Sequence, residues 1–217
     1  MVDTYDIAIL ANGAAPRHKT PLRILTEATV LICCDGAVSV AEAAGRKPDF
    51  AIGDGDSVAP ADRLLLGERF VQVAEQDTND LSKAFRFACS LHHAPPESLK
   101  IAVLGATGLR EDHSIGNVFR LLEFTANVPH TAIFTDTGSF EAVRGERCFS
   151  CNSGEPVSVF APVPGTAVSS LGLMWPLDGV SLADLWAGTL NRTTGRSFVL
   201  RTNGKPVLVY RPYADSH

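Results

Sequence analysis

The feature that most constrains the fold is an alternation of short apolar runs with helix-like segments over the first two thirds of the chain. Apolar runs occupy residues 7–10, 30–34, 50–52, 101–104 and 130–134, and helix-like segments occupy residues 38–44, 79–92 and 115–124. Continuous apolar runs separated by helices are typical of a mostly parallel sheet that helices cover on both faces. We therefore predict an α/β domain in this part of the chain.

Two of the helix-like segments show the 3.6-residue period of a helix with one buried face. In residues 79–92 the predicted buried face comprises Leu81, Ala84, Phe85, Ala88 and Leu91. In residues 115–124 it comprises Ile115, Val118, Phe119 and Leu122. We expect both helices to pack these faces against the sheet.

From about Arg144 the helical period ends, and Gly, Pro, Thr and Val become frequent. The segment SFVLRTNGKPVLVY has two strand-like arms around Asn203-Gly204, a pair that favours a tight β-hairpin. We predict an α/β domain in residues 1–143 and a small antiparallel β domain in residues 144–217. A β domain of about 70 residues has a small core, so we expect it to pack on the first domain or on a second subunit.

The composition excludes several classes of function. The chain has 217 residues, of which 45% are apolar, as in an ordinary globular protein. Its net charge of -5 and its lack of a Lys/Arg-rich block argue against nucleic-acid binding. No apolar stretch reaches the roughly 18 residues of a membrane span, and the start MVDTYDIAIL has no signal-peptide pattern. The five cysteines, an odd number, indicate reduced thiols, and we expect a cytoplasmic protein.

Acidic residues follow the ends of several predicted strands. Asp35 follows one apolar run, and Asp54 and Asp56 follow the next in the stretch AIGDGDSV. Ligands of parallel sheets bind where the carboxyl ends of the strands meet the following loops. These residues and the loop that ends at Asp112 are therefore expected on one rim, although Asp54-Gly55-Asp56 alone also suits a plain surface turn.

The segment EQDTNDLSKA, residues 75–84, is a second acidic group. Asp77 is the predicted N-cap of the following helix, with Asp80 at its N3 position. One interpretation is structural, because both carboxylates complement the positive end of the helix dipole. The other is functional, because the spacing brings Asp77, Asp80 and Lys83 near one face of the helix, where carboxylates hold a metal and Lys83 reaches a phosphate.

The third group is GATGLREDH, residues 105–113. A glycine-rich turn after a strand brings backbone N–H groups close to phosphates, although Gly-x-x-Gly also serves ordinary turns. Arg110 offers a planar pair of donors for phosphate oxygens, and Asp112 follows. His113 suits a capping role as well as a catalytic one. Neither the dinucleotide fingerprint Gly-x-Gly-x-x-Gly nor the P-loop pattern occurs.

Taken together, these groups predict a cation site. Six carboxylates stand at predicted strand or helix ends, namely Asp35, Asp54, Asp56, Asp77, Asp80 and Asp112. They would repel one another on one rim unless cations lay among them, and hard oxygen ligands of this kind suit Mg²⁺. With Arg110 and Lys83 as phosphate ligands, the set indicates phosphoryl or pyrophosphoryl transfer, in which positioning and charge neutralisation dominate.

Four segments in this order, CCDGAV, PDFAIGDGDSV, EQDTNDLSKA and GATGLREDHSIGNV, resemble those of thiamine pyrophosphokinases. LGLMWPL and GTLNRTTG extend the resemblance weakly through the β domain. The resemblance implies transfer of the pyrophosphate of ATP to the hydroxyethyl group of thiamine, giving thiamine diphosphate and AMP. It also implies Mg²⁺, a three-layer Rossmann-like α/β domain, a β-sandwich domain, and a homodimer with thiamine at the subunit junction.

The resemblance also implies roles for individual residues. The metal and phosphates would be held by Asp54, Asp56 and Asp80. Arg110 and Asp112 would act on the nucleotide. Further nucleotide contacts would come from Asp35, Gly36, Asp77, Lys83, Gly105, Thr107 and His113. The reacting centre and the thiamine site would be lined by Gln76, Asp77, Asp80, Trp175 and Asn191. The hydroxyl proton would pass to Asp80 or to Asp112, and the cationic thiazolium favours an aromatic wall such as Trp175.

The sequence departs from the family pattern at three places. The usual Asp-Gly-Gly-Ala is Asp35-Gly36-Ala37, Gly55 stands where a bulky apolar residue is usual, and Leu190 replaces the serine before Asn191. The last two departures leave the metal site intact and bear on the acceptor. One alternative is therefore a pyrophosphokinase for another hydroxyalkyl heterocycle, such as a pterin, and another is a non-catalytic nucleotide or thiamine sensor. A dehydrogenase is disfavoured because its glycine fingerprint is missing.

Overall fold

The computed structural model describes residues 4–214 except 57, 59–62, 65, 76, 94, 182 and 183. The chain divides into two compact units, Met1–Asp136 and Thr137–His217. The division after residue 143 that the sequence predicts falls at the end of strand β7 (Gly138–Val143). That strand pairs with β14 (Val207–Pro212) over its whole length and therefore belongs to the second unit.

The strands of the first unit pair in the order β6-β5-β1-β2-β3-β4, and every pair is parallel. They are β1 (Ile7–Leu10), β2 (Val30–Cys34), β3 (Phe50–Gly53), β4 (Phe70–Gln72), β5 (Lys100–Leu104) and β6 (His130–Phe134). Five of them coincide with the predicted apolar runs, whose side chains are almost entirely buried. The sixth, β4, was not predicted, because three residues are too few to show a strand period.

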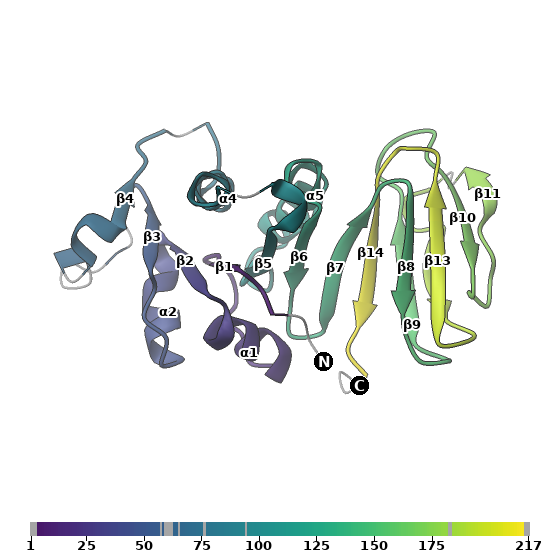
Figure 1. Cartoon of the computed structure of the whole chain (residues 1–217), viewed down its shortest axis with the longest axis horizontal. Coiled ribbons are helices and arrows are strands. Elements are labelled where there is room, and N and C mark those ends of the chain that lie inside the picture. The colour runs from purple at the N-terminus through teal and green to yellow at the C-terminus, as the bar shows by residue number, and fades with distance from the viewer. Residues whose placement is uncertain are drawn as a thin grey trace. The chain divides into compact units, whose positions relative to one another are not determined.

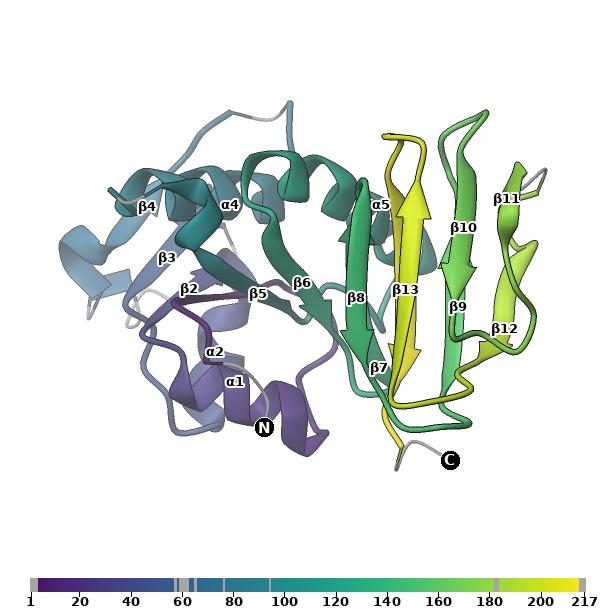
Figure 2. The same ribbon diagram turned by 45° about the vertical axis from the view of Figure 1, so that its right-hand side comes forward.

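Helices cover both faces of this sheet, as Figures 1 and 2 show. One face carries α1 (Lys19–Glu27) and α2 (Val38–Ala43), and the other carries α4 (Asp80–Leu91) and α5 (Glu111–Asn127). Short 3-10 turns are η1 (Asp35–Ala37), η2 (Gly67–Arg69) and η3 (Pro96–Ser98). The three-layer, mostly parallel α/β architecture is therefore confirmed. None of the described helices is long and apolar enough to cross a membrane.

The predicted buried face is correct for α4 but wrong for α5. In α4, Leu81, Ala84, Phe85 and Ala88 are buried. In α5 the buried residues are Leu121 and Phe124, while Ile115 is 59% exposed. The face with Leu121 and Phe124 carries polar residues, such as Asn117, one turn earlier, so its apolar period is too short to be recognised from the sequence. Phe124 stacks on Phe85 with ring centroids 4.1 Å apart, which joins the two helices.

The second unit is a two-sheet sandwich. One sheet has the order β12-β9-β14-β7 and the other β11-β10-β13-β8, with antiparallel pairing throughout. In Figure 2 the strands of the second sheet lie side by side in the order β8, β13, β10 and β11. The remaining strands are β8 (Glu146–Ser150), β9 (Pro156–Phe160), β10 (Ala167–Leu171), β11 (Asp178–Ser181), β12 (Gly188–Arg192) and β13 (Ser197–Thr202). The predicted antiparallel β-sandwich is confirmed.

The hairpin predicted around Asn203-Gly204 is wrong. The two arms are β13 and β14, but β13 pairs with β8 and β10 in one sheet, while β14 pairs with β7 and β9 in the other. Leu200 and Val209 both point into the core that the two sheets share. Asn203 is tied to the β10 side, since its backbone N–H donates to the carbonyl oxygen of Ala167. The turn therefore carries the chain from one sheet to the other.

Candidate functional site

Two loops of the first unit are joined at the carboxyl ends of β1 and β5. The backbone N–H of Ala11 donates to the carbonyl of Leu104 at 2.8 Å, and that of Gly13 donates to the carbonyl of Gly105 at 2.7 Å. Gly105 has φ +61°, and a Cβ atom there would lie 2.6 Å from the Ala11 carbonyl oxygen. Only glycine suits this position, so the glycine-rich turn has a structural cause as well as a possible phosphate role.

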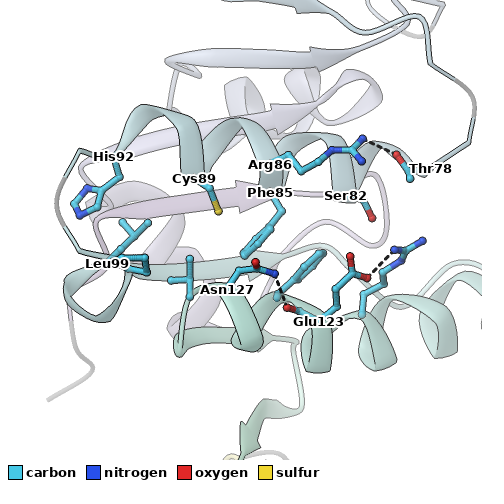
Figure 3. Close-up of a pocket in the computed structure, with 13 residues that line it drawn as sticks. Thr78, Ser82, Phe85, Arg86, Cys89, His92, Leu99, Glu123 and Asn127 are labelled. Carbon is cyan, nitrogen blue, oxygen red and sulfur yellow. Dashed lines mark hydrogen bonds and ion pairs between the residues drawn. The ribbon is translucent and has the colours of Figure 1, made fainter.

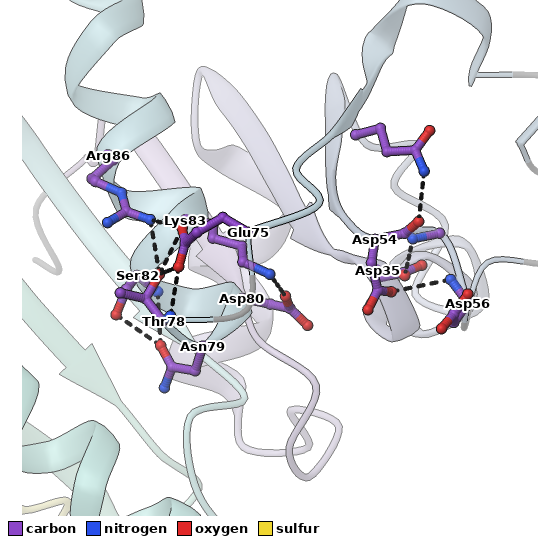
Figure 4. Close-up of polar contacts among 12 residues, drawn as sticks. Asp35, Asp54, Asp56, Glu75, Thr78, Asn79, Asp80, Ser82, Lys83 and Arg86 are labelled. Carbon is purple, nitrogen blue, oxygen red and sulfur yellow. Dashed lines mark hydrogen bonds and ion pairs between the residues drawn. The ribbon is translucent and has the colours of Figure 1, made fainter.

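The aspartates after β2 and β3 surround one turn, which Figure 4 shows. The N–H of Gly55 donates to the carboxylate of the buried Asp35 at 2.8 Å, and the N–H of Asp56 donates to that of Asp54 at 3.1 Å. Gly55 has φ +92°, a conformation that disfavours any side chain, which explains why glycine separates the two aspartates. The prediction that these strand ends meet is confirmed.

The start of α4 differs from the prediction. Its N-cap is Asn79, not Asp77: the Asn79 side-chain oxygen accepts from the backbone N–H of Ser82 at 3.0 Å and from the Ser82 hydroxyl at 2.7 Å. Asp80 is consequently the first helical residue rather than the third. Its carboxylate accepts a hydrogen bond at 3.1 Å from Lys83, whose side chain is buried. The helix therefore presents an ion pair in its first turn.

A network that the sequence did not predict holds the segment before α4. The backbone N–H and the hydroxyl of Thr78 donate to the Glu75 carboxylate at 2.6 and 2.9 Å. Arg86 donates to Glu75 at 2.7 Å and to the Thr78 hydroxyl at 2.8 Å (Figure 4). The hydrogen bonds from Thr78 lower the pKa of Glu75, so its carboxylate stays ionised.

The loop after β5 carries an exposed ion pair. Arg110 donates to both oxygens of Asp112, at 3.1 and 2.6 Å, and these hydrogen bonds lower the pKa of Asp112 to about 2. Asn117, one turn into α5 beyond His113, donates to the carbonyl of Ala106 at 2.8 Å. Asn117 also accepts from the Asn79 side chain at 3.0 Å, which connects this loop with the start of α4.

These loops enclose a cavity of about 490 Å³ in the first unit. It brings together seven of the residues predicted from the sequence, namely Asp54, Asp80, Lys83, Gly105, Thr107, Arg110 and His113. Sequence reasoning missed other lining residues, among them Asn12, Asn79, Ser114 and Asn117. Asn12 follows β1, so the strand-end rule that places Asp35 and Asp54 on the rim also places Asn12 there.

The other predicted residues of this unit lie around the cavity rather than on its wall. Asp35 is buried and accepts from Gly55, and Gly36 lies directly against the Asn12 amide. Asp56 and Asp77 are exposed. The position of the predicted residue Gln76 lies outside the described residues.

In the second unit, Asn191 of β12 holds the segment that carries Trp175. The Asn191 side chain is only 3% exposed, accepts from the Trp175 N–H at 3.2 Å and donates to the Trp175 carbonyl at 2.7 Å. The Trp175 side chain is 55% exposed. Leu190, which stands in place of the usual serine, has φ +59° and a solvent-exposed side chain. Asn191 thus fixes the backbone of Trp175 while its ring faces solvent.

The donors on the rim match Mg²⁺ in type but do not form a ready cluster. Among the residues that the structure describes, no group of three or more His, Cys, Asp or Glu side chains stands at a spacing that would hold a metal ion. Mg²⁺ commonly takes one or two carboxylates and completes its coordination with waters and substrate phosphates. Asp54 and Asp80, which both line the cavity, fit a cation that enters together with a polyphosphate.

All five cysteines are free thiols, which agrees with the expectation of reduced cysteines. Burial raises the pKa of the Cys33 thiol to about 12, and burial likewise raises the pKa of Cys34. Cys148 and Cys151 are not joined, and Cys151 contacts the carbonyl of Gly195. The buried thiols of Cys33 and Cys34 are therefore protonated and suit packing rather than redox chemistry.

Comparisons with known proteins agree with the two-unit fold. Thiamine pyrophosphokinase 1 of Oryza sativa subsp. japonica is 30% identical over 155 residues, which are 63% of this chain and 55% of that protein. Thiamine pyrophosphokinase 3 of the same plant is 28% identical over 213 residues, 82% of this chain and 75% of that protein. The chain thus matches little more than half the length of the first of these relatives.

A solved structure shows the same fold. The crystal structure of thiamine pyrophosphokinase from Bacillus subtilis superposes with a TM-score of 0.78 at 20% identity, covering 96% of this chain and 99% of that one. The family model of the thiamin pyrophosphokinase catalytic domain matches residues 22–133, and that of the substrate-binding domain matches residues 138–210. Since the first model alone spans half of the sequence and the second spans most of the rest, this chain belongs to the thiamin pyrophosphokinase family.

Proposed function

We propose that this chain transfers the pyrophosphate of ATP to the hydroxyethyl group of thiamine, giving thiamine diphosphate and AMP. The observation that carries the proposal is the cavity of the first unit, where Asp54 and Arg110 from two loops meet Asp80 and Lys83 from the first turn of α4. Carboxylates beside cationic donors are what a metal–polyphosphate complex requires.

The cavity residues divide the work of binding ATP. Lys83 is 4% exposed and is oriented by Asp80, so its ammonium is available to a phosphate at little conformational cost. Arg110 stands at the exposed edge, where it can exchange Asp112 for a phosphate oxygen. Thr107 and Gly105 would place backbone N–H groups close to the phosphates. Nucleotide contacts for Asp35, Gly36, Asp77 and His113 belong to the same proposal.

Mg²⁺ would be held by Asp54 and Asp56, with Asp80 as the third candidate ligand. When bound, the ion spreads the charge that develops on the transferred phosphates. Asp80 and Asp112 remain the two candidate acceptors of the thiamine hydroxyl proton. Asp80 is favoured because it lines the cavity, whereas Asp112 does not.

The thiamine site is proposed to include Trp175, Asn191 and Gln76. The exposed face of Trp175 suits the cationic thiazolium. Asn191 would act through Trp175, because its amide is already bonded to the backbone of that residue. A homodimer that binds thiamine at the subunit junction, acting in the cytoplasm, completes the proposal.

Incubation of the purified chain with ATP, Mg²⁺ and thiamine tests this function. We expect AMP and thiamine diphosphate in equal amounts, measured by chromatography. Omission of Mg²⁺ and omission of thiamine are the controls. AMP formation with a hydroxymethyl pterin but not with thiamine would show that the acceptor is wrong, and tight thiamine binding without AMP would show a sensor instead.

A further inference from the structure

Two asparagines join two segments of the cavity wall in the first unit. Asn79 is the N-cap of α4, Asn117 lies in the second turn of α5, and both line the cavity. The side-chain amide of Asn79 donates to the side-chain oxygen of Asn117 at 3.0 Å. We refer to this contact as the amide bridge.

Each amide of the bridge is also held by a second partner. The Asn117 amide donates to the carbonyl of Ala106, in the glycine-rich turn after β5, at 2.8 Å. The Asn79 oxygen accepts from the backbone N–H and the hydroxyl of Ser82, at 3.0 and 2.7 Å (Figure 4). An amide turned end for end would exchange its donor and its acceptor and lose these contacts. A continuous line of hydrogen bonds therefore runs from Ala106 to the first turn of α4.

The two ends of this line carry groups that the proposed function assigns to phosphates. At one end Asp80 and Lys83 form their ion pair, at 3.1 Å, in the first turn of α4. At the other end Gly105 and Thr107 flank Ala106 in the sequence. Both sets of groups line the cavity, and the amide bridge fixes the distance between them.

Helices α4 and α5 are also joined by an apolar contact that is separate from the bridge. Phe85 stacks on Phe124 with ring centroids 4.1 Å apart, and both side chains are buried. These two residues line a second cavity, which lies between the helices and which Figure 3 shows. Loss of the amide bridge should therefore leave the helices packed. The start of α4 would lose only its fixed distance from the glycine-rich turn.

We propose that Asn79 and Asn117 are positioning residues, which set the separation that a polyphosphate spans between the first turn of α4 and the glycine-rich turn. Neither side chain needs to touch the reacting atoms for this role. The inference rests on the proposed function, because it assigns a polyphosphate to the same cavity. A nucleotide that contacts both sets of groups should depend on the bridge, whereas one that contacts a single set should not.

The binding test compares α,β-methylene-ATP, which resists cleavage between its α- and β-phosphates, with AMP. Both nucleotides are titrated by calorimetry with Mg²⁺ and without thiamine. Asn117→Ala should weaken binding of the triphosphate about fivefold, the loss expected for one hydrogen bond, and leave AMP binding unchanged. Equal losses for both nucleotides would indicate a merely structural role and would overturn the proposal.

Asn79→Ser breaks the bridge while it keeps the helix cap. Serine is as good an N-cap as asparagine, so its hydroxyl should still accept from the backbone N–H of Ser82, but it cannot donate across to Asn117. We expect the same loss of triphosphate binding as for Asn117→Ala. The double variant should bind no more weakly than the weaker single variant, because both substitutions break one contact. Losses that add would show that the two residues act independently, which would overturn the bridge.

Asn127→Ala is the matched control. Asn127 is also an asparagine of α5 whose side chain donates to a backbone carbonyl, that of Glu123 at 3.0 Å. It lines the second cavity, at the other end of the helix (Figure 3), and its loss should change neither nucleotide binding nor AMP formation. Thermal unfolding checks that all variants fold.

Steady-state AMP formation separates this inference from the proposed function. Both bridge variants should raise KM for ATP and lower kcat several-fold, while KM for thiamine stays unchanged. Bridge-dependent binding of α,β-methylene-ATP by a chain that makes no AMP from thiamine would overturn the function and leave the bridge standing. Normal KM for ATP and normal binding in both variants of an active chain would overturn the bridge alone. A parent chain that bound neither nucleotide would overturn both.

Discussion

The two units present their candidate binding residues in different ways. In the first unit, Asp54 and Arg110 stand in loops after parallel strands, so the direction of the chain alone places them on one rim. In the second unit, Trp175 lies in a loop whose position depends on one buried side chain, Asn191, from another strand. Topology therefore determines the first site, whereas a specific tertiary contact determines the second.

Because of this difference, mutations in the two units should change different kinetic constants. Residues of the rim act on the reacting phosphates, so their loss should lower kcat. Trp175 contacts only the acceptor in the proposal, so its loss should raise KM for thiamine. If variants of both units changed the same kinetic constant, the two units would not have distinct roles.

The largest effect is expected for Asp54→Asn. The substitution keeps the shape of the side chain but removes the charge that a metal–polyphosphate complex requires, so kcat should fall roughly a hundredfold or more. Steady-state AMP formation measures it, and thermal unfolding should show a retained fold. Asp178→Asn, an exposed aspartate in the second unit, is the control. Near-normal kcat for Asp54→Asn would remove the metal role from this residue.

The sequence predicted the rim because its signals are local. Each apolar run ends in a polar loop, and parallel pairing brings these ends together, so Asp54, Asp80 and Arg110 were found without coordinates. What the sequence missed depends on contacts between distant residues. The Arg86–Glu75–Thr78 network and the hydrogen bonds of Asn191 to Trp175 leave no periodic signal in the chain.

Two wrong predictions have the same origin. The apolar period in α5 predicted that Ile115 is buried, which is wrong. The face that is buried carries Asn117, a polar residue that lines the first cavity, so it shows no clear apolar period. Asn203-Gly204 gives the turn expected of a hairpin, but whether the arms pair depends on Leu200 and Val209 packing from opposite sheets. A local pattern identifies an element, whereas its partner is chosen by the core.

The second prediction compares two glycines with positive φ. Gly55→Ala and Gly45→Ala should each lower the free energy of unfolding by about 1–2 kcal/mol, since both residues adopt left-handed backbone, with φ of +92° and +79°. The backbone N–H of Gly55 donates to Asp35, and a Cβ atom at Gly55 would crowd Arg63. A Cβ atom at Gly45 would meet no neighbouring atom. Gly55→Ala should therefore also lower kcat. Denaturant unfolding and AMP formation separate the two effects, and equal kcat in both variants would contradict the proposed role of the turn.

In the second unit, Trp175→Ala should raise KM for thiamine about two- to fivefold while kcat changes little, because a cation–π contact with an exposed tryptophan contributes about 0.5–1 kcal/mol. Trp186→Ala is the matched control, since Trp186 is also an exposed tryptophan of this unit but lies outside the proposed site. If Trp175→Ala lowered kcat instead, Trp175 would contribute to the reacting centre and the contrast between the units would fail.

The smallest effect concerns the pH dependence of the Arg110–Asp112 pair. Hydrogen bonds from Arg110 lower the pKa of Asp112 to about 2 from its ordinary value of 3.8. A depressed pKa stabilises the folded state above the ordinary value, and that stabilisation is lost as the pH falls from about 4 towards 2. Because the pair is exposed, the change in stability should be slight, so the direct measurement is an NMR titration of the Asp112 carboxyl carbon.

Arg110→Gln should return the pKa of Asp112 towards its ordinary range, because the side chain that donates these hydrogen bonds is removed. Addition of AMP to the parent chain should shift the pKa of Asp112 in the same direction if Arg110 leaves Asp112 for a phosphate. An Asp112 titration that does not respond to AMP would show that Arg110 keeps its partner when the nucleotide binds. The rim would then hold phosphates through Lys83 without help from the exposed edge of the cavity.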